Sequence, residues 1–502
     1  MKMKRMLCLI LALLVSTVSV FANVQKVPYN GYVYDAWEDA IPSQVGYVPD
    51  KTYSGITLGT GAFSVPEDFF VDEDTNLIYV LDSGNKRVVV LDQNFKHIQT
   101  IDQFTLNGEP SPLNAPQSIF VTDGKLYIAD TENRRAIVCD MTGNIINVID
   151  KVQPGEKNYE ISPDDVDFKP RKLIVDAAGN VYILIKNVFQ GAMVFNTLNE
   201  FDGYYGSTRV KVTFQVIRDY LWKEIMSKEQ VENMTNYVPV EYQNFDIDAN
   251  DFVYSVTQES GNSDSVRKLN PSGANILETG KIYGDLDIVY ERAKAKNIET
   301  LFTDIVVDKK GFTSALDISR GRIFHYDEEM SSLFIFGNIG KQAGTFKTPV
   351  AIEVLDPEQN GSGLILVLDK DKANITTFRL TEFGQRVHDA VLLYNMGKYT
   401  EAIEPWSDVL QRDNNYEFAH IGMGKASHYA GEYKAAMDYF KAGQDHMSYS
   451  GSLSEYRVEV IRSNFTWIML ALALLIALVG LRKRYTAWIK KKIAEKKGGA
   501  QK

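Results

Sequence analysis

A strand-rich unit recurs six times along the chain, and this repeat restricts the possible folds more than any other feature. The aligned copies start near residues 66, 116, 170, 242, 302 and 349. Each copy holds short runs of β-branched and aromatic residues separated by Asp, Asn and Gly turns. A repeat of roughly 45–50 residues with about four strands is the unit of a β-propeller, because each blade buries its faces against its neighbours. The sequence therefore predicts a mostly β fold with a six-bladed β-propeller over residues 57–380.

The fourth copy starts unusually far after the third, and the extra residues have a different pattern. Between Gly203 and Tyr237 the strand signal stops, and residues 214–226 carry apolar side chains at helical spacing. Ser227–Gln230 then offers a capping box for a second helix. We expect a helical insertion at residues 203–239. It could be a lid packed on the propeller or a docking element for a partner, and the sequence favours neither.

Beyond the propeller the repeat length changes to 34 residues. Small and aromatic residues return at this offset, and the eight positions are Gly397, Tyr399, Ala402, Trp406, Gly431, Tyr433, Ala436 and Phe440. This pattern resembles the tetratricopeptide repeat, where small residues let two helices approach and an aromatic fills the gap between them. Two repeats need a capping helix, and Ser452–Glu455 offers a capping-box start for one. We expect an α-helical tetratricopeptide domain with its capping helix at residues 383–463.

The N-terminus has the pattern of an export signal. A basic start is followed by an apolar run that ends in Ala22, which predicts a signal peptide over residues 1–22. Residues 23–56 lack a repeat copy and are expected to form an extended segment. One cysteine, Cys139, remains after the signal, so no internal disulfide is possible. Cys139 lies on an expected strand and is interpreted as a core residue.

The C-terminus has the pattern of a membrane anchor. Residues 465–481 are apolar apart from Thr466 and Gly480, and residues 482–502 hold nine Lys or Arg against one acid. Such a segment followed by cations predicts a single transmembrane helix with a basic cytoplasmic tail. The body would then be extracytoplasmic, at the cell membrane of a bacterium. Because the net charge is −11 although both ends are basic, the body is strongly acidic and a nucleic-acid partner is not expected.

Blades one and two carry a specific turn motif. Asp82, Asn85 and Arg87 follow one strand, and the same residue types recur in the next copy as Asp130, Asn133 and Arg135. These segments resemble the NHL-repeat propellers, which belong with the TolB-like six-bladed folds. The resemblance covers about residues 57–380 and is weak in blades four and five. It implies that the six residues tie the turn between strands together, and we interpret them as structural.

The residues before the inner strands are the candidates for a binding site. A propeller presents such residues around its central opening, and the second residue after each blade start is polar in five copies: Asp68, Ser118, Lys172, Asn244 and Asp304. The chain lacks the common nucleophile-elbow, P-loop, dinucleotide and zinc-protease motifs. We therefore assign no catalytic residue, no metal site and no cofactor.

Three classes of function are consistent with these features, and one of them is a purely structural cell-envelope protein. The first is a membrane-anchored binding or scaffold protein that uses its propeller and helical surfaces to bind a ligand or a protein partner in the membrane or envelope. The general arrangement of NHL-type proteins suggests a link to a carbohydrate transport complex. The alternative is a metal-dependent lactonase-like hydrolase, in which Asp68, Asn244 and Asp304 would hold a divalent cation. Against it, Ser64–Glu67 stands where that family has a Glu-Gly-Pro signature.

Overall fold

The computed structural model describes residues 27–151, 167–206, 241–257, 265–277, 281–286, 289–291, 296–359, 361 and 363–498. It divides into two compact units, Met1–His388 and Asp389–Lys502. The expected signal peptide lies outside the described residues, as does the expected helical insertion from residue 207 onward. Its first residues, 203–205, belong to a strand instead, because β17 spans Phe201–Tyr205.

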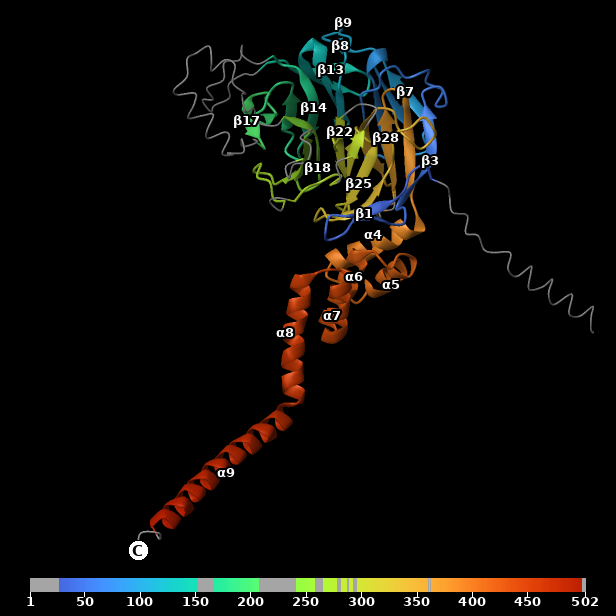
Figure 1. Cartoon of the computed structure of the whole chain (residues 1–502). Coiled ribbons are helices and arrows are strands. Elements are labelled where there is room, and N and C mark those ends of the chain that lie inside the picture. The colour runs from blue at the N-terminus through green and yellow to red at the C-terminus, as the bar shows by residue number, and fades with distance from the viewer. Residues whose placement is uncertain are drawn as a thin grey trace, which may run out of the picture. The chain divides into compact units, whose positions relative to one another are not determined.

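Six sheets, almost entirely antiparallel, follow one another along the first unit and form the six blades of a β-propeller (Figure 1). The prediction of six blades is therefore confirmed. Blade 1 consists of β4 (Asp68–Asp72), β5 (Leu77–Asp82), β6 (Arg87–Leu91) and β7 (His97–Ile101). Blade 2 consists of β10 (Ser118–Thr122), β11 (Lys125–Asp130), β12 (Arg135–Asp140) and β13 (Asn144–Ile149), and is extended by β8 (Thr105–Leu106) and β9 (Glu109–Pro110). Blade 3 consists of β14 (Pro170–Val175), β15 (Val181–Ile185), β16 (Ala192–Phe195) and β17.

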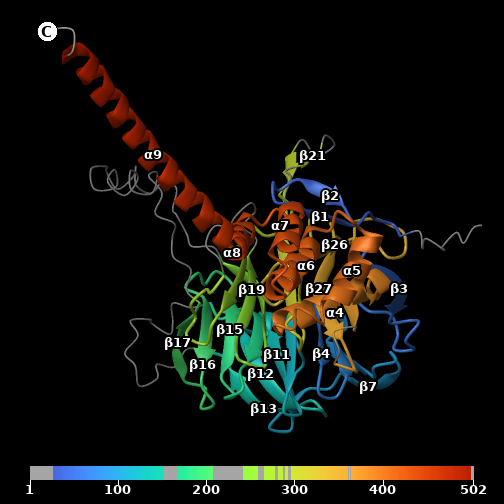
Figure 2. The ribbon, with the colours of Figure 1, turned by 90° about the horizontal axis from the view of Figure 1, so that it is seen from below.

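Blades 4 to 6 complete the ring (Figure 2). Blade 4 consists of β18 (Tyr242–Ile247), β19 (Val253–Thr257) and β20 (Val266–Leu269). Blade 5 consists of β23 (Phe302–Val307), β24 (Thr313–Asp317), β25 (Arg322–Tyr326) and β26 (Ser332–Phe336). Blade 6 contains β27 (Pro349–Leu355), β28 (Leu364–Asp369) and β29 (Asn374–Leu380). A short hairpin, β21 (Val289–Glu291) and β22 (Lys296–Ile298), lies between blades 4 and 5 in the sequence.

The N-terminal segment completes two of these blades. Strand β3, Tyr47–Ser54, pairs antiparallel with β29 and is the outermost strand of blade 6. Strand β1, Tyr32–Tyr34, pairs with β26 of blade 5 and carries β2, Ala40–Pro42, on its other edge. The segment over residues 23–56, which was expected to be extended and to precede the propeller, therefore contributes strands to two blades in its described part. The propeller begins before residue 57, and its first and last strands close the ring side by side.

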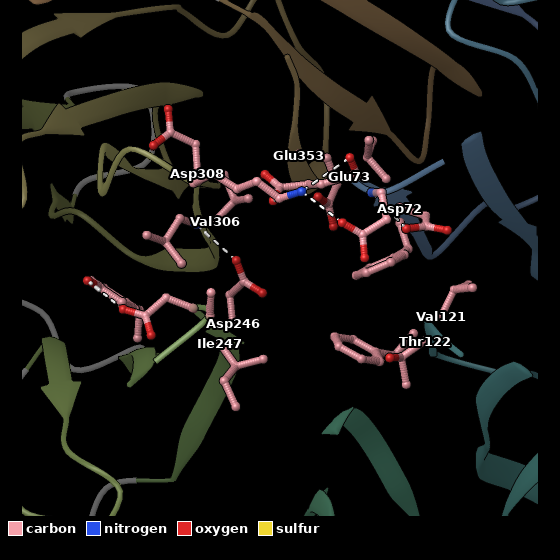
Figure 3. Close-up of a pocket in the computed structure, with 18 of the residues that line it drawn as sticks. Asp72, Glu73, Val121, Thr122, Asp246, Ile247, Val306, Asp308 and Glu353 are labelled. Carbon is pink, nitrogen blue, oxygen red and sulfur yellow. Dashed lines mark hydrogen bonds and ion pairs between the residues drawn. The ribbon is translucent and has the colours of Figure 1, made fainter. Parts of the chain in front are cut away.

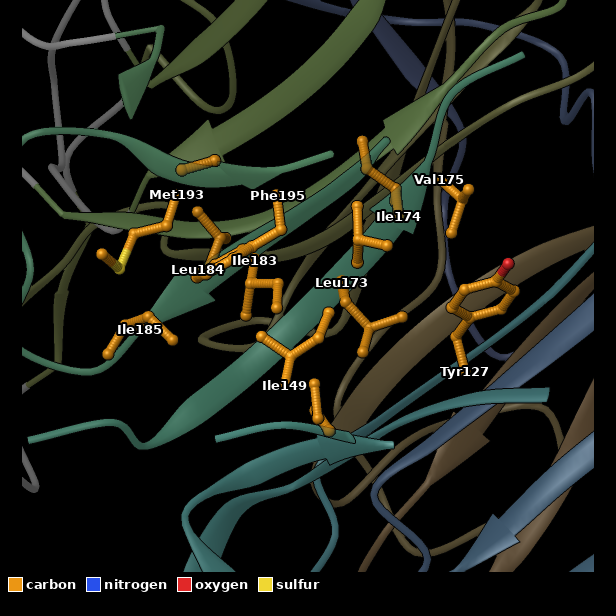
Figure 4. Close-up of a cluster of buried hydrophobic side chains, with 14 of the residues drawn as sticks. Tyr127, Ile149, Leu173, Ile174, Val175, Ile183, Leu184, Ile185, Met193 and Phe195 are labelled. Atoms are coloured by element: carbon orange, nitrogen blue, oxygen red, sulfur yellow. The ribbon is translucent and has the colours of Figure 1, made fainter. Parts of the chain in front are cut away.

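Each blade is buried on both faces, and the space between blades 2 and 3 shows how the strands achieve this. Leu173 and Ile183, on neighbouring strands of blade 3, are fully buried together with Phe195. They pack in one cluster with Tyr127 and Ile149 of blade 2 (Figure 4). Successive side chains of a strand point to opposite faces. A blade therefore contributes apolar side chains to the cores on both of its sides, as its nearly continuous apolar strands predict.

The turn motif of blades 1 and 2 forms a compact hydrogen-bonded group. The Oδ2 atom of Asp82 accepts hydrogen bonds from Asn85 Nδ2 at 2.7 Å and Arg87 Nε at 2.8 Å, while its Oδ1 accepts one from the Ser64 N–H. The same contacts recur in blade 2 among Asp130, Asn133, Arg135 and Asn114. Each group fixes a short 3-10 turn, η1 (Ser83–Asn85) or η2 (Thr131–Asn133), to the loop before the blade.

The C-terminal α-helical region consists of six helices. They are α4 (Glu382–Asn395), whose start belongs to the first unit, α5 (Ile403–Arg412), α6 (Glu417–Tyr429), α7 (Tyr433–Ala442), α8 (His446–Ser463) and α9 (Phe465–Gly498). Trp406 of α5 and Phe440 of α7 are buried against α6, where a Cβ on Gly422 or Gly424 would clash with them. Both aromatic residues occupy the same position of the 34-residue pattern. The tetratricopeptide assignment itself stays a prediction.

Helix α8 begins earlier than expected. It begins at His446, because Asp445 caps it by accepting a hydrogen bond from the Ser448 N–H. The expected start at Ser452–Glu455 is wrong, since Ser452 is buried inside the helix and contacts His428. At its other end α8 stops at Ser463. The amide of Asn464 bonds back to the Val460 carbonyl, and this local bond competes with a regular helix.

Helix α9 extends well beyond the expected transmembrane segment, residues 465–481. Residues 465–494 form the one stretch of the described chain that is long and apolar enough to cross a membrane, and it is wholly exposed in the structure. Because such a helix would bury its apolar side chains if it belonged to a soluble core, its exposure is consistent with a membrane anchor. The structure thus weakly supports the predicted anchor.

Candidate functional site

The five polar residues predicted to line the central opening all lie near the start of an inner strand. The side chains of Asp68, Ser118, Lys172, Asn244 and Asp304 are all buried. Lys172 of blade 3 reaches Asp68 of blade 1, and its Nζ atom lies 3.1 Å from Asp68 Oδ2. Because these two blades are not neighbours, this ion pair crosses the axis of the propeller.

The acidic members of this group also join neighbouring blades. Asp68 accepts hydrogen bonds from its own strand, at Phe69 N–H, and from the next inner strand, at Ile119 N–H. Asp304 does the same with Ile305 and Ile352. Each carboxylate therefore fixes one inner strand to the next, which is a structural role. Asn244 accepts only from Phe245 in its own strand, and the Ser118 hydroxyl has no hydrogen-bond partner among the described residues.

The charges of this group depend on one another. Burial raises the pKa of Asp304 to about 7, the Lys172 ammonium opposes this shift, and Asp68 adds to it. Burial alone would lower the pKa of Lys172, but the carboxylates of Asp68, Asp304 and Glu353 outweigh that effect and raise it. Lys172 is therefore the internal counter-ion of the axis.

A cavity of about 650 Å³ opens at the other end of the inner strands. Since side chains on one face of a strand recur every second residue, the residues two positions further along the inner strands form its floor. These are Phe70, Phe120, Asp246, Val306 and Glu353. Figure 3 shows the labelled side chains around this cavity, contributed by blades 1, 2, 4, 5 and 6. None of these floor residues was a predicted site residue.

The floor of the cavity has an apolar part and an acidic part. The rings of Phe70 and Phe120 lie 4.7 Å apart across the boundary of blades 1 and 2. On the acidic part, burial raises the pKa of Asp246 to about 6, against the hydrogen bond that it accepts from the Val307 N–H. Burial also raises the pKa of Glu353 well above its usual range, and the nearby Asp246 contributes to this. The Lys172 ammonium lowers the pKa of both carboxyl groups but does not offset the effect of burial.

The rim is formed by the turns that follow the inner strands, and many of its acids have a structural role there. Asp308 accepts hydrogen bonds from the Lys310 and Phe312 N–H groups, and Asp248 accepts from Asn250 and Phe252. This agrees with the expectation that acids in turns serve local hydrogen bonding. Burial nevertheless raises the pKa of Asp308 to about 7.

Carboxyl groups dominate the charge of the cavity wall. Its two lysines are Lys309 and Lys310, and Lys309 is paired with Asp74 at 2.9 Å. The nine acids of the lining are Asp72, Glu73, Asp74, Asp123, Asp246, Asp248, Asp308, Glu328 and Glu353. An excess of carboxylates in a concave site concentrates the electrostatic field there and attracts cations.

The metal-ion alternative finds little support at the axis. In the described part of the chain, no group of three or more His, Cys, Asp or Glu side chains is placed to hold a metal ion. The cation that faces Asp68 and Asp304 is the Lys172 ammonium. Asp68 and Asp304 are thus near a built-in positive charge, which disfavours a divalent ion beside them.

Some solved structures resemble this chain. No family model and no curated protein matches the sequence. Among solved structures, virginiamycin B lyase from Staphylococcus aureus is similar at 9% identity and a TM-score of 0.39, over 66% of this chain and 99% of that one. A gluconolactonase from Xanthomonas campestris is similar at 10% identity and a TM-score of 0.38, over 68% and 99%.

A third similar structure is described as the extracellular domain of a hybrid two-component system from B. thetaiotaomicron. It has 14% identity and a TM-score of 0.34, and the match covers 70% of this chain and 41% of that one. These likenesses go no further than the β-propeller, which the strand order establishes by itself. They select neither an enzyme nor a binding protein.

The floor residues could have been found from the sequence by one further step. Asp68 and Phe70, or Asn244 and Asp246, are two residues apart on the same inner strand and face the same way. The alternation therefore predicts a second set of axis-facing residues beyond the first. What the sequence does not show is which set borders an open cavity, because that depends on the side chains of all six blades together.

Proposed function

We propose that this chain is a membrane-anchored, extracytoplasmic binding protein that holds a small organic cation in the propeller cavity. The observation that carries the proposal is the cavity floor, where Asp246 and Glu353 stand beside Phe70 and Phe120. A carboxylate pair attracts an ammonium or guanidinium group, and aromatic rings accept both apolar carbon and positive charge. The apolar exposed helix α9 supports the anchor.

The proposed function includes a protein partner and stands against the lactonase-like alternative. A ligand bound outside the membrane can act through a second protein of the membrane or envelope. We propose that the helical region contacts a partner in the membrane or envelope, such as a transport complex. The lactonase-like alternative is disfavoured by Lys172, whose ammonium already neutralises the axis carboxylates.

Three probes with the same body and different charge test the cavity. They are 2-phenylethylammonium, 2-phenylethanol and phenylacetate, titrated by calorimetry into the full chain in a non-ionic detergent. We expect the cation to bind at least about tenfold more tightly than the alcohol, because each tenfold step corresponds to about 1.4 kcal/mol and a charged hydrogen bond contributes about that much. Phenylacetate should show no binding.

Two double variants separate the cavity from the general surface charge. Asp246→Asn with Glu353→Gln should remove the preference for the cation while keeping the shape of the floor. The matched control, Asp102→Asn with Glu132→Gln, removes two exposed carboxylates outside the cavity and should leave all three affinities unchanged. Equal binding of the cation and the alcohol by the unaltered chain would contradict the proposal.

The pH dependence of the cation's affinity provides a further prediction. Burial holds the pKa of Glu353 well above its usual range in the free protein, and a cation bound beside it would lower that pKa by favouring the carboxylate. Binding therefore releases a proton, and the affinity for 2-phenylethylammonium should rise as the pH increases from 6 to 8. Calorimetry in two buffers of different ionisation enthalpy measures the released proton directly. Uptake of a proton would contradict this role of Glu353.

A further inference from the structure

The second half of α9 combines basic and aromatic residues that the proposed function does not use. Six cations lie between residues 482 and 492, and residues 482–494 contain no acid. The six are Arg482, Lys483, Arg484, Lys490, Lys491 and Lys492, here called the basic collar. All six are exposed, so the rest of the structure does not cover them.

The apolar residues between these cations gather on one side of the helix. At about 100° per residue, Tyr485, Trp488, Ile489 and Ile493 fall within an arc of about 140°. Three of them are large and exposed, with Tyr485 62%, Trp488 52% and Ile493 51% accessible. By the same geometry, Lys483 and Lys490 lie beyond one edge of the arc, and Arg484 and Lys491 lie beyond the other. Arg482 and Lys492 fall within the arc, so cations both border the apolar residues and lie among them. Aromatic and apolar residues mixed with cations are typical of a helix segment at a membrane interface.

Side-chain contacts join the aromatic residues and the collar. The rings of Tyr485 and Trp488 are stacked with centroids 6.1 Å apart. The Lys492 ammonium lies 4.8 Å from the centre of the Trp488 ring, on its face. Tyrosine and tryptophan are enriched where the hydrocarbon layer meets the headgroups. The ammonium that covers Trp488 is therefore held at the level where lipid phosphates lie.

The length of the apolar segment places the collar at that level as well. Residues 465–481 extend about 26 Å as a helix, whereas the hydrocarbon core is about 30 Å thick. A segment slightly shorter than the core draws its flanking residues toward the bilayer, and long cationic side chains extend to the headgroups. Arg482 to Arg484 follow the segment at once in the same unbroken helix. They are therefore in reach of the phosphate layer.

We infer that the basic collar binds anionic phospholipids of the cytoplasmic leaflet and selects them over zwitterionic ones. Each cation near a negative membrane surface contributes about 1 kcal/mol, and the attraction decays within a Debye length. Six cations without an acid give the complementarity, and the aromatic residues fix their depth. The inference rests on the membrane anchor of the proposed function.

The lipid composition around the protein tests this inference. The full chain is reconstituted in vesicles of phosphatidylcholine and phosphatidylglycerol at a ratio of 7:3 and released in polymer-bounded discs. Mass spectrometry of the discs then gives the lipids that surround the protein. We expect phosphatidylglycerol to be at least about twofold enriched over the bulk ratio, and the enrichment to fall in 0.5 M salt. Both leaflets have the same composition, so the orientation of the protein does not affect the result.

Two six-residue variants complete the experiment. Changing the whole basic collar to Gln should abolish the enrichment. The control changes six exposed lysines of the propeller and α7 to Gln and should leave it intact; these are Lys51, Lys86, Lys96, Lys125, Lys186 and Lys434. Enrichment that persists in the collar variant, or no enrichment in the unaltered chain, overturns the inference. A chain that an alkaline wash removes from the vesicles would instead contradict the anchor itself.

Discussion

A chain that begins at residue 55 is expected not to fold, although it retains all six of the repeat copies. Its missing strand β3 pairs with β29 from Tyr47↔Leu380 to Ser54↔Asn374 and closes blade 6. Without β3 the ring is open and a long sheet edge is exposed, which is a site of aggregation. We expect no cooperative thermal transition by circular dichroism.

The apolar contacts of β3 explain the size of this effect. Tyr47 is 3% accessible and stacks on Phe336 with ring centroids 5.0 Å apart, and Phe378 is fully buried beside them. Each large apolar side chain that is buried contributes about 1.5–3 kcal/mol. The loss of the strand and of the cores it covers therefore approaches the entire stability of a domain, about 5–15 kcal/mol.

A second truncation separates ring closure from a general effect of shortening. A chain that begins at residue 44 lacks β1 and β2 but keeps β3, so blade 6 stays complete. We expect it to unfold in a single transition, at a lower temperature than the chain that begins at residue 23. If the chain without β3 shows the same transition as this control, the N-terminal strand does not close the propeller.

The repeat made the blades predictable, whereas the closing strand could not be found in the same way. The strand pattern recurs six times within the sequence, and six copies are enough to count the blades. Strand β3 has no copy to align with, and Pro49 interrupts its strand pattern. Proline is tolerated because β3 is an edge strand. The pairing of β3 with β29 follows from the closure of the ring, and no local sequence pattern predicts it.

The helical region shows the same limit at a smaller scale. The 34-residue offset predicted helices and the buried Trp406 and Phe440, because those positions depend on local spacing. The start of α8 was misplaced because two capping signals compete, Asp445 with Ser448 and Ser452 with Glu455. The helix begins after Asp445 because Ser452 is buried within the helical region, where its hydroxyl contacts His428 Nδ1 at 2.8 Å. Tertiary packing decided between two locally acceptable starts.

The residues predicted to line the central opening and the residues of the cavity floor are different positions of the inner strands. Asp68 and Lys172 were predicted to line the opening, and in the structure they form an ion pair with each other. Asp246 and Glu353, which form the acidic part of the cavity floor, come from the next axis-facing positions of their strands. Burial raises both pKa values, and a nearby carboxylate adds to each: Asp248 to that of Asp246, and Asp246 to that of Glu353. These causes need the folded arrangement.

Replacing Lys172 by Met is expected to destabilise the propeller by about 3–5 kcal/mol at pH 8, because it leaves buried carboxylates without their counter-ion. The Lys172 side chain is 11% accessible and that of Asp68 is 4% accessible. Met keeps the apolar stem, so the change removes chiefly the charge. The control is Lys169→Met, which breaks the more exposed Lys169–Glu132 pair and should cost at most about 1 kcal/mol.

The deficit of the Lys172 variant should shrink in acid, and the direction follows from Asp304. Its pKa in the folded protein, about 7, lies above the unfolded value, so the folded state binds more protons between these two values. Folding stability then decreases as the pH rises through this range. The Lys172 ammonium lowers the pKa of Asp304, so its loss raises that pKa further. The decrease in folding stability then extends to higher pH. The free energy of unfolding from urea titrations should therefore differ less between variant and unaltered chain at pH 5 than at pH 8. A deficit that is equal at both pH values would mean that lost packing, and not unpaired charge at the propeller axis, causes it.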